Sequence, residues 1–290
     1  MKKNRKNFRA ELSQLLGFLF VRISVYTILL VLLFFFYDVS NRGFKVISWE
    51  FLSEPPRRGM TEGGILPAIV GTFLVTLITA LFAVPIGMAA AIYLHEYARP
   101  NRLTRLVRLS IRNLAGVPSI VYGLFGVILF VNWLKFGTSV LSAGLTLGLL
   151  TLPWTITASE EALKSVPDSY RHGALALGAT KWQMIRTNVL PYALPGMLTG
   201  AVLGLARAAG ETAPIMFTGA AFYLPYLPRS FKDQFMALPY HLYVMATQHH
   251  SIDQAKPIAY GTALVLIVFV VVFNLGAILI RGRLRNKWRH

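Results

Sequence analysis

Long apolar runs separated by short polar segments dominate the chain. Six of them reach the roughly 20 residues that a helix needs to cross a bilayer. Each run predicts a membrane-spanning helix, because a helix satisfies its own backbone polar groups within the lipid. The second and fifth runs are longer than a bilayer requires, which predicts tilting, breaks or extension beyond the lipid. The six runs are residues 16–37, 65–94, 114–134, 140–159, 191–221 and 258–281.

Composition supports this class of protein and excludes several others. Of 290 residues, 55% are hydrophobic and 14% charged, which is typical of a membrane protein. There is no cysteine, so disulfides and Cys-based zinc sites are excluded. No third ligand has helpful spacing to His249 and His250, so we expect no metal site. No P-loop and no nucleophile–base arrangement occurs either, so we expect neither nucleotide binding nor catalysis by this chain.

The formal net charge of +17 follows membrane topology. Nineteen of the 29 Lys and Arg residues lie in the two terminal tails, the 95–113 loop and the 160–190 segment, which share one side of the membrane. Eight lie on the other side, and Arg22 and Arg207 lie within spans. The positive-inside rule therefore predicts that both termini are cytoplasmic. The basic character then reflects orientation, and we expect no nucleic-acid partner.

An arginine-rich loop follows the second predicted span. Leucines and an isoleucine alternate with its arginines, a spacing that suits a helix lying along the anionic inner surface of the membrane. The alternative is an ordinary positive-inside cluster, which is the rule in such loops. The arginines are Arg99, Arg102, Arg105, Arg108 and Arg112.

The polar segment 160–190, between the fourth and fifth spans, predicts two short helices. Asp168 and Ser169 follow Pro167 and are good N-cap residues for a helix that continues to Ala176. Gly178 offers a turn, and residues 181–189 form a second helix. The segment is too polar to span the membrane, so we interpret it as a docking element; a well-folded connecting loop is the alternative.

Two opposite charges interrupt the fifth span, in the stretch GLARAAGETAP. Arg207 and Glu211 are four residues apart, so on one helix they share a face and partly neutralise each other. Charges within a span usually face a pathway, and a guanidinium matches the oxygens of an oxyanion. The pair is therefore a candidate anion site or gate; the alternative is an ion pair that fixes helix packing.

The glycines of the same span recur every four residues and predict close helix packing. They are Gly196, Gly200 and Gly204.

The third span contains a candidate helix break at Gly116, Pro118 and Ser119. A break there would open backbone groups to a pathway, and a plain kink explains the same residues equally well.

Several stretches resemble the permeases of ABC importers. Residues 160–191 resemble the cytoplasmic "EAA" loop of that family: Gly178 matches the family glycine, and Leu190-Pro191 the closing pair. His172, Gly173 and Ala174 occupy the E-A-A positions, so the acidic residue is replaced. Three further stretches, LAGVPSIVYGLFG, LPWTITASEEALKSVP and LARAAGETAP, are together similar to the phosphate-specific group and its PstA-type subunit.

The resemblance implies an all-α membrane protein with six transmembrane helices in the type I ABC importer permease fold. A cytoplasmic coupling helix would lie between the fourth and fifth spans. Residues 1–63 would hold the N-terminal tail, the first helix and an extracytoplasmic loop; residues 64–281 the permease domain; and residues 282–290 a basic cytoplasmic tail. The first span would wrap a neighbouring subunit.

The implied function is a permease subunit of an ATP-driven phosphate importer in the bacterial inner membrane. Partners would be a second, PstC-like permease, an ATPase dimer that binds ATP and Mg²⁺, and an extracytoplasmic phosphate-binding protein. Arg207 and Glu211 would line the pathway. Five residues of the coupling loop would meet the ATPase: Asp168, His172, Gly173, Ala174 and Gly178. The alternatives are a permease for another oxyanion, such as sulfate or molybdate, or a stand-alone secondary transporter.

Overall fold

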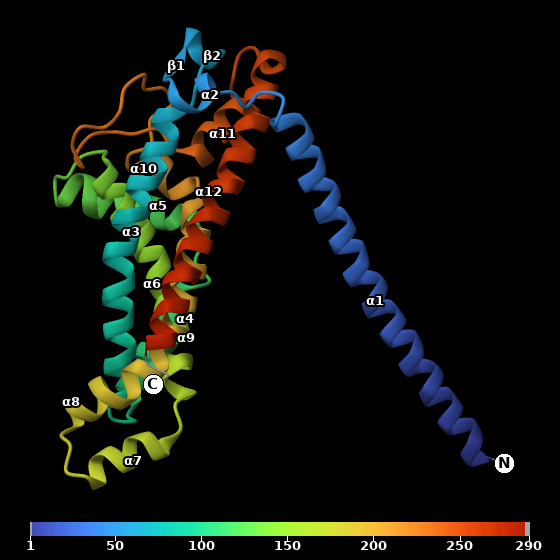
Figure 1. Ribbon diagram of the computed structural model, residues 1–290, viewed down its shortest axis with the longest axis vertical. Helices are drawn as coiled ribbons and strands as arrows, with labels where there is room; N and C mark the ends of the chain where they lie inside the picture. Colours follow the sequence, from blue (N-terminus) through green and yellow to red (C-terminus); the bar gives the residue numbers. More distant parts are fainter. Residues whose placement is uncertain (1, 288–290) are drawn as a thin grey trace.

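The computed structural model describes the backbone of residues 2–287 and the side chains of residues 14–279; the last three residues of the expected tail lie outside it. An upright helical bundle is joined to one long helix, α1 (Lys2–Gly43), which diverges from it (Figure 1). Short helices α7 and α8 lie at one end of the bundle, called here the α7 end. A small β-hairpin lies at the other, the hairpin end (Figure 1).

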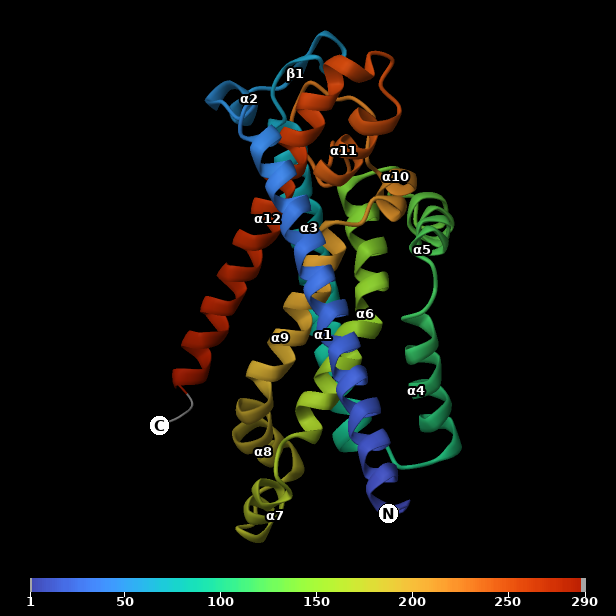
Figure 2. The ribbon, with the colours of Figure 1, turned by 90° about the vertical axis from the view of Figure 1, so that its right-hand side faces the viewer.

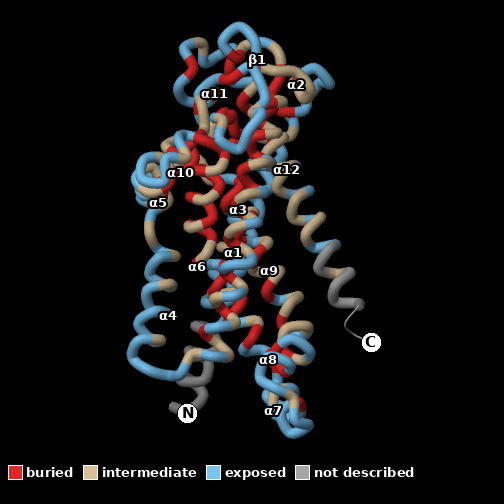
Figure 3. Tube along the Cα trace, turned by 90° about the vertical axis from the view of Figure 1, so that its left-hand side faces the viewer, coloured by how far each residue is buried: buried red, intermediate tan, exposed pale blue. Residues whose placement is uncertain are grey.

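Three helices form the centre of the bundle: α3 (Leu66–Ile92), α6 (Val140–Lys164) and α9 (Leu190–Ala209). Buried residues follow all three, whereas the outer helices are largely exposed (Figure 3). Buried threonines satisfy their hydroxyl groups on backbone carbonyls; Thr79, for example, donates to Val75 O (2.8 Å) and to Gly144 O (3.1 Å). The core of the bundle therefore leaves few polar groups unpaired, as a membrane interior requires. Helix α12 (Ile252–Lys287) packs beside α1, α9 and α11 (Leu238–Thr247).

Glycines set the close contact between α6 and α9. A Cβ added to Gly196 would lie 2.9 Å from Cβ of Ala162, and one added to Gly200 would collide with Cβ of Ala158. A small-residue face of this kind lets two helix backbones approach closely. The close packing predicted from the glycine spacing is confirmed.

Five described helices are long and apolar enough to span a membrane. Two further helices meet at a bend of 104°, and they form a sixth span if the two together are counted as one span. The five are Gln14–Gly43, Leu66–Tyr97, Val140–Lys164, Lys181–Ala209 and Ile252–Leu279.

The bent pair takes the place of the third span predicted at 114–134, and its bend falls at the candidate break residues Gly116, Pro118 and Ser119. It joins α4 (Arg102–Leu114) to α5 (Ser119–Gly126), which continues as the π-helical segment η3 (Val127–Trp133). The arginine-rich loop is thus a helix, but α4 runs upright beside α6 and not across the end of the bundle (Figure 2). The prediction of a surface-lying helix is wrong, because Arg108 ties α4 to α6 through Glu160 (3.1 Å).

The fifth predicted span is also broken. Helix α9 ends at Ala209, and after Gly210–Thr212 the chain starts a new helix, α10 (Ala213–Thr218), with Pro214 in its first turn. Proline is favoured there because it has no N–H to satisfy and its φ suits a helix.

The α7 end contains the two short helices expected between α6 and α9. Helix α7 (Asp168–Ala176) has the predicted bounds, but its N-cap is Pro167 and no side chain caps it. Gly178 has φ +83° and makes the predicted turn. Helix α8 (Lys181–Met184) then continues through the π-helical segment η4 (Ile185–Val189) into α9, so the second helix does not end before Pro191.

The hairpin end was not anticipated from the sequence. It comprises α2 (Trp49–Ser53), the strands β1 (Pro56–Arg57) and β2 (Glu62–Gly63) around the turn η1 (Arg58–Met60), and α11. An isolated bridge between Ala220 and Phe235 joins the two ends of the long loop between α10 and α11. A hydrophobic cluster that includes Phe51, Leu238 and Met245 holds these pieces together.

Candidate functional site

The ion pair that interrupts the fifth span forms at the end of α9. Arg207 Nε donates to Glu211 Oε1 at 3.5 Å. The two residues do not share one helical face as predicted, because α9 ends at Ala209 and Glu211 lies in the break before α10. The backbone N–H of Glu211 donates to Ala208 O (3.1 Å), which keeps the carboxylate next to the last turn of α9.

An aromatic ring supports the same guanidinium. Cζ of Arg207 lies 5.0 Å from the ring centroid of Trp154, which belongs to α6. A cation over the face of an indole is stabilised by about 0.5–2 kcal/mol, and the plane of the ring limits where the guanidinium can lie. The sequence analysis missed Trp154, because a tryptophan beside a proline in an apolar span gives no sign of its distant partner.

Arg207 is open toward the surface of the isolated chain. Its side chain is 52% exposed and that of Glu211 is 17% exposed. Within the described part of the chain, Nε makes the only hydrogen bond of this guanidinium, so both Nη groups have donors to spare. An oxyanion could therefore bind the open edge of Arg207 without displacing Trp154 or Glu211.

The helices that follow the two breaks pack against each other. Helix α5 packs against α10, and a Cβ added to Gly123 would lie 3.0 Å from Cα of Pro214. Gly116, Pro118 and Ser119 form the turn between α4 and α5, across which Tyr122 Oη donates to Leu114 O (2.9 Å). No hydrogen bond or ring contact joins this turn to Arg207 among the described residues.

The predicted coupling residues lie on and just after α7. His172, Gly173 and Asp168 are exposed, whereas Ala174 is buried in the hydrophobic cluster of the α7 end. The Asp168 carboxylate accepts from Arg171 Nη1 (3.2 Å) instead of capping the helix. The sequence analysis also missed Arg171, whose other partners lie outside α7. The outer face of α7 is therefore free to meet a partner.

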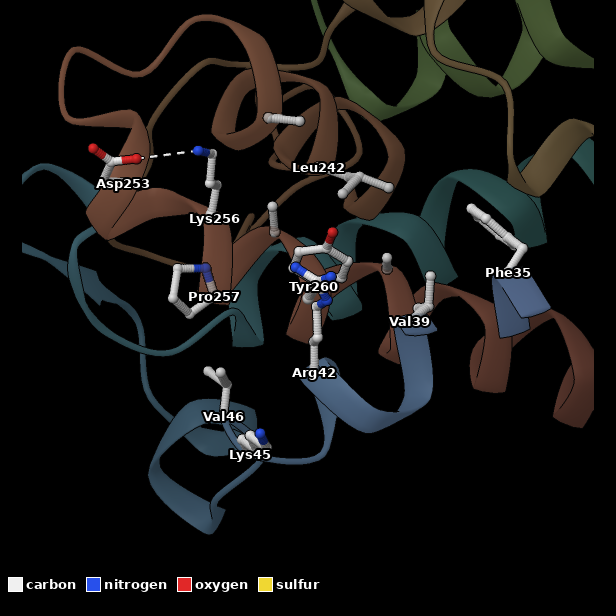
Figure 4. A pocket seen from close by; sticks show the side chains of 13 residues that line it. Phe35, Val39, Arg42, Lys45, Val46, Leu242, Asp253, Lys256, Pro257 and Tyr260 are labelled. Atoms are coloured by element: carbon white, nitrogen blue, oxygen red, sulfur yellow. Dashed lines mark hydrogen bonds and ion pairs between the residues drawn. The ribbon is translucent and has the colours of Figure 1, made fainter. Parts of the chain in front are cut away.

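A cavity of about 970 Å³ lies elsewhere, between α1 and α12 at the hairpin end (Figure 4). Its arginine, Arg42, is hydrogen-bonded to Asp38 (2.7 Å) and lies over the ring of Tyr260. Lys256 is paired with Asp253 (3.1 Å; Figure 4). Arg42 and Arg207 thus have the same kinds of partner, a carboxylate and an aromatic ring, and Arg207 differs in lying at the break between α9 and α10.

The histidines of the hairpin end are structural in this arrangement. His249 Nε2 lies 2.9 Å from Gly59 O, its Nδ1 accepts from Ser251 N (3.1 Å), and its ring stacks on His250. No group of three or more potential metal ligands occurs among the described residues.

The chain is a bundle of apolar helices, with a charged pair at a break in one helix and an exposed short helix at one end. These features define a membrane permease. The family model for the inner membrane component of binding-protein-dependent transport systems matches residues 83–290. The chain belongs to this family. It is therefore a multi-pass inner-membrane protein and a permease component of an ABC importer, not an enzyme in its own right.

Curated relatives agree with this assignment. The chain is 32% identical to the probable ABC transporter permease protein YqgI of Bacillus subtilis, over 84% of this chain and 86% of that protein. It is 37% identical to the phosphate transport system permease protein PstA 1 of Mycobacterium tuberculosis, over 76% of this chain and 71% of that protein. A probable phosphate permease, PstA, of Methanocaldococcus jannaschii is 36% identical over 74% of this chain and 75% of its own length. PstA-type permeases are thus relatives of this chain.

Solved structures share its fold. The MetNI methionine ABC transporter, in an inward-facing conformation, aligns with a TM-score of 0.62 at 19% identity, over 76% of this chain and 95% of that chain. A bacterial alginate ABC transporter in complex with its periplasmic protein aligns with a TM-score of 0.66 at 16% identity, over 92% of this chain and 95% of that chain. The predicted type I importer permease fold is confirmed.

Proposed function

We propose that the chain is a permease subunit of an importer that moves inorganic phosphate. The observation that carries the proposal is the open guanidinium of Arg207, held between Trp154 and Glu211 at a break in α9. Relatives named as phosphate permeases support the same substrate. A permanently charged fork of N–H donors suits a phosphate oxyanion, and the neighbouring carboxylate repels a second one.

The proposed cycle couples this site to ATP through α7. An ATPase dimer, which binds ATP and Mg²⁺, docks on the exposed face of α7 around His172 and Gly173, while the buried Ala174 anchors the helix. Asp168 and the turn at Gly178 mark the two ends of this docking element. This places the α7 end and both termini in the cytoplasm, in agreement with the excess of Lys and Arg on that side.

The other partners follow from the surfaces that remain. The hairpin end carries exposed aromatic residues in the loop after α10, among them Phe222, Tyr226 and Phe231, which suit a contact with an extracytoplasmic phosphate-binding protein. A second, PstC-like permease would cover the open side of Arg207 and complete the pathway. Helix α1, largely exposed between residues 14 and 37, would lie against that subunit.

Uptake of radiolabelled phosphate into vesicles that contain the full assembly tests this proposal. We expect phosphate uptake to require both ATP and the binding protein. Excess sulfate or molybdate should not reduce this uptake. Competition by sulfate or molybdate would instead identify a permease for another oxyanion. Uptake that persists without the ATPase would indicate a secondary transporter.

A further inference from the structure

The α7 end contains an ion pair between elements that are distant in sequence. Arg171 of α7 donates from Nη2 (2.9 Å) and from Nε (3.2 Å) to Oε1 of Glu96. The side chains of Arg171 and Glu96 are 14% and 5% exposed. Two N–H groups that converge on one carboxylate oxygen make a charge-assisted contact of defined orientation.

The same guanidinium also binds the end of α6. Its Nη2 donates to Leu163 O (2.9 Å) and its Nη1 to Val166 O (2.8 Å). The last carbonyls of a helix have no partner within that helix, so Arg171 supplies one for them. One side chain thus connects α7 with the ends of both α3 and α6.

Helix α7 has few other attachments to the bundle. Ala174 is its one buried residue, and the ring of Tyr170 lies 5.3 Å from that of Tyr192. Among the described residues, every hydrogen bond and ion pair between α7 and the end of α3 involves Arg171. A polar connection from α7 to α3 therefore depends on this one residue.

Glu96 lies at a point where α3 changes its helical form. The last turns of α3 continue as the π-helical segment η2 (Tyr93–Tyr97), and π-helical turns frequently occur at functional sites. A second arginine holds the same segment from another side: Arg108 of α4 donates to Leu94 O (2.7 Å) and to Glu160 (3.1 Å). Segment η2 is thus fixed to α4, α6 and α7.

We infer that Arg171 is the positioning residue through which a displacement of α7 reaches α3. The inference rests on the proposed docking of an ATPase at α7. If α7 moved alone, it would leave the buried carboxylate of Glu96 without its partner, which is strongly unfavourable. Segment η2 therefore moves with α7, and α3 carries the displacement to α6 and α9, against which it packs. Mechanical coupling between α7 and α3 needs a contact that is kept when either of the two helices moves.

Distance measurements between two labels test this inference in the full assembly. The chain has no cysteine, so spin labels at Leu177→Cys and Tyr93→Cys have no background from it. Both positions are exposed, at 91% and 62%, and they lie just after α7 and within η2. A non-hydrolysable ATP analogue should leave the distance between the labels unchanged. In the Glu96→Gln variant, the same analogue should shift the distance, because α7 then moves without η2.

Transport provides the second readout. Glu96→Gln should lower phosphate uptake per ATP hydrolysed by about tenfold to a hundredfold, the range seen when positioning is lost, while ATP hydrolysis by the assembled complex continues. Arg171→Glu combined with Glu96→Arg should recover part of the loss. Lys256→Gln, which removes an exposed ion pair at the hairpin end, is the control and should change neither readout.

The outcomes are distinct. If Glu96→Gln does not assemble, Arg171→Lys gives the same test, because lysine keeps the charge and loses the set of donors. An unchanged label distance in these variants, or uptake and hydrolysis that fall in equal proportion, would overturn the inference. The label measurement needs only the ATP analogue and no phosphate, so a failure of phosphate uptake in the unaltered assembly would refute the proposed substrate and leave this test valid.

Discussion

Three arginines of this chain differ in how many partners hold the guanidinium. Arg171 is nearly buried and donates to Glu96, to Asp168 and to two backbone carbonyls. Arg42 is exposed, paired with Asp38 and covered by Tyr260. Arg207 makes one hydrogen bond, to Glu211, and rests on Trp154. An arginine keeps its charge in every setting, so its remaining donors decide whether it can bind a ligand. In Arg42 and Arg207 both Nη groups are free of hydrogen bonds among the described residues, and of these two only Arg207 lies at a break between helices of the bundle.

His241 shows how burial acts on a titratable residue. It lies in α11, outside the candidate spans, and is fully buried. Neither ring nitrogen has a hydrogen-bond partner among the described residues. Burial, with a smaller contribution from the nearby His249, lowers the pKa of His241 from 6.5 to about 4. A protonated ring would be left without a counter-ion in this site, so His241 stays neutral near pH 7.

Stability should therefore depend on pH through His241. In the unfolded chain the imidazole binds a proton below pH 6.5, whereas in the folded chain it does so only near pH 4. The contribution of the neutral His241 ring to the stability of the folded chain is therefore complete above pH 6.5 and is lost as the pH falls toward 4. We expect the hairpin end to lose about 2 kcal/mol between pH 7 and pH 5 from this group. Thermal denaturation of the purified protein as a function of pH measures the loss.

Replacement of the ring separates this effect from general acid sensitivity. His241→Leu should flatten the pH dependence between pH 7 and pH 5, since leucine has a similar size and does not titrate. His250→Gln, at an exposed position, should leave it as it is. An equally steep pH dependence in the His241→Leu variant would contradict this explanation.

At the scale of elements, two predicted spans are broken, and the pieces that follow the breaks pack together. Helices α5 and α10 both follow a turn, and a proline lies at the start of each: Pro118 is the N-cap of α5, and Pro214 is in the first turn of α10. Hydropathy located these spans correctly, because it averages over about 20 residues. It could not show the 104° bend, because glycine and proline are also common in straight membrane helices.

The contact between α6 and α9 can be tested by changing single methyl groups. Gly200→Ala should destabilise the protein by about 1–3 kcal/mol, because its Cβ would overlap that of Ala158. Ala158→Gly in the same chain should recover most of the loss by removing the opposing methyl group. The free energy of unfolding in detergent, measured for both single variants and the double variant, gives the coupling between the two positions.

A matched control is available in α12. A Cβ added to Gly276 meets no atom within 4 Å, so Gly276→Ala should have little effect. Additive effects of Gly200→Ala and Ala158→Gly would mean that the two helices do not pack in this way.

For the whole molecule, sequence patterns predicted the class of fold well and the contacts between distant elements poorly. The spans and the short helix α7 follow from local hydropathy and from Pro167 and Gly178, so they could be read directly. The pair of Arg171 with Glu96 joins residues 75 positions apart, and Trp154 supports Arg207 from another helix. Such contacts depend on how helices pack, and nothing in the local sequence encodes the partner. The charges at Arg207 and Glu211 were visible because an apolar span makes any charge conspicuous.

The most direct test of the central claim is ATP-dependent phosphate uptake by the full assembly with Arg207→Gln, at an equal amount of assembled complex. Glutamine keeps the approximate length of the side chain and removes its charge. Uptake should fall by at least about tenfold, as expected when a charged hydrogen-bond donor worth about 1.5–3 kcal/mol is lost. Arg22→Gln, at an exposed position in α1, is the matched control and should retain uptake. Normal uptake by the Arg207→Gln variant would contradict the account, and would show that the ion pair with Glu211 serves packing alone.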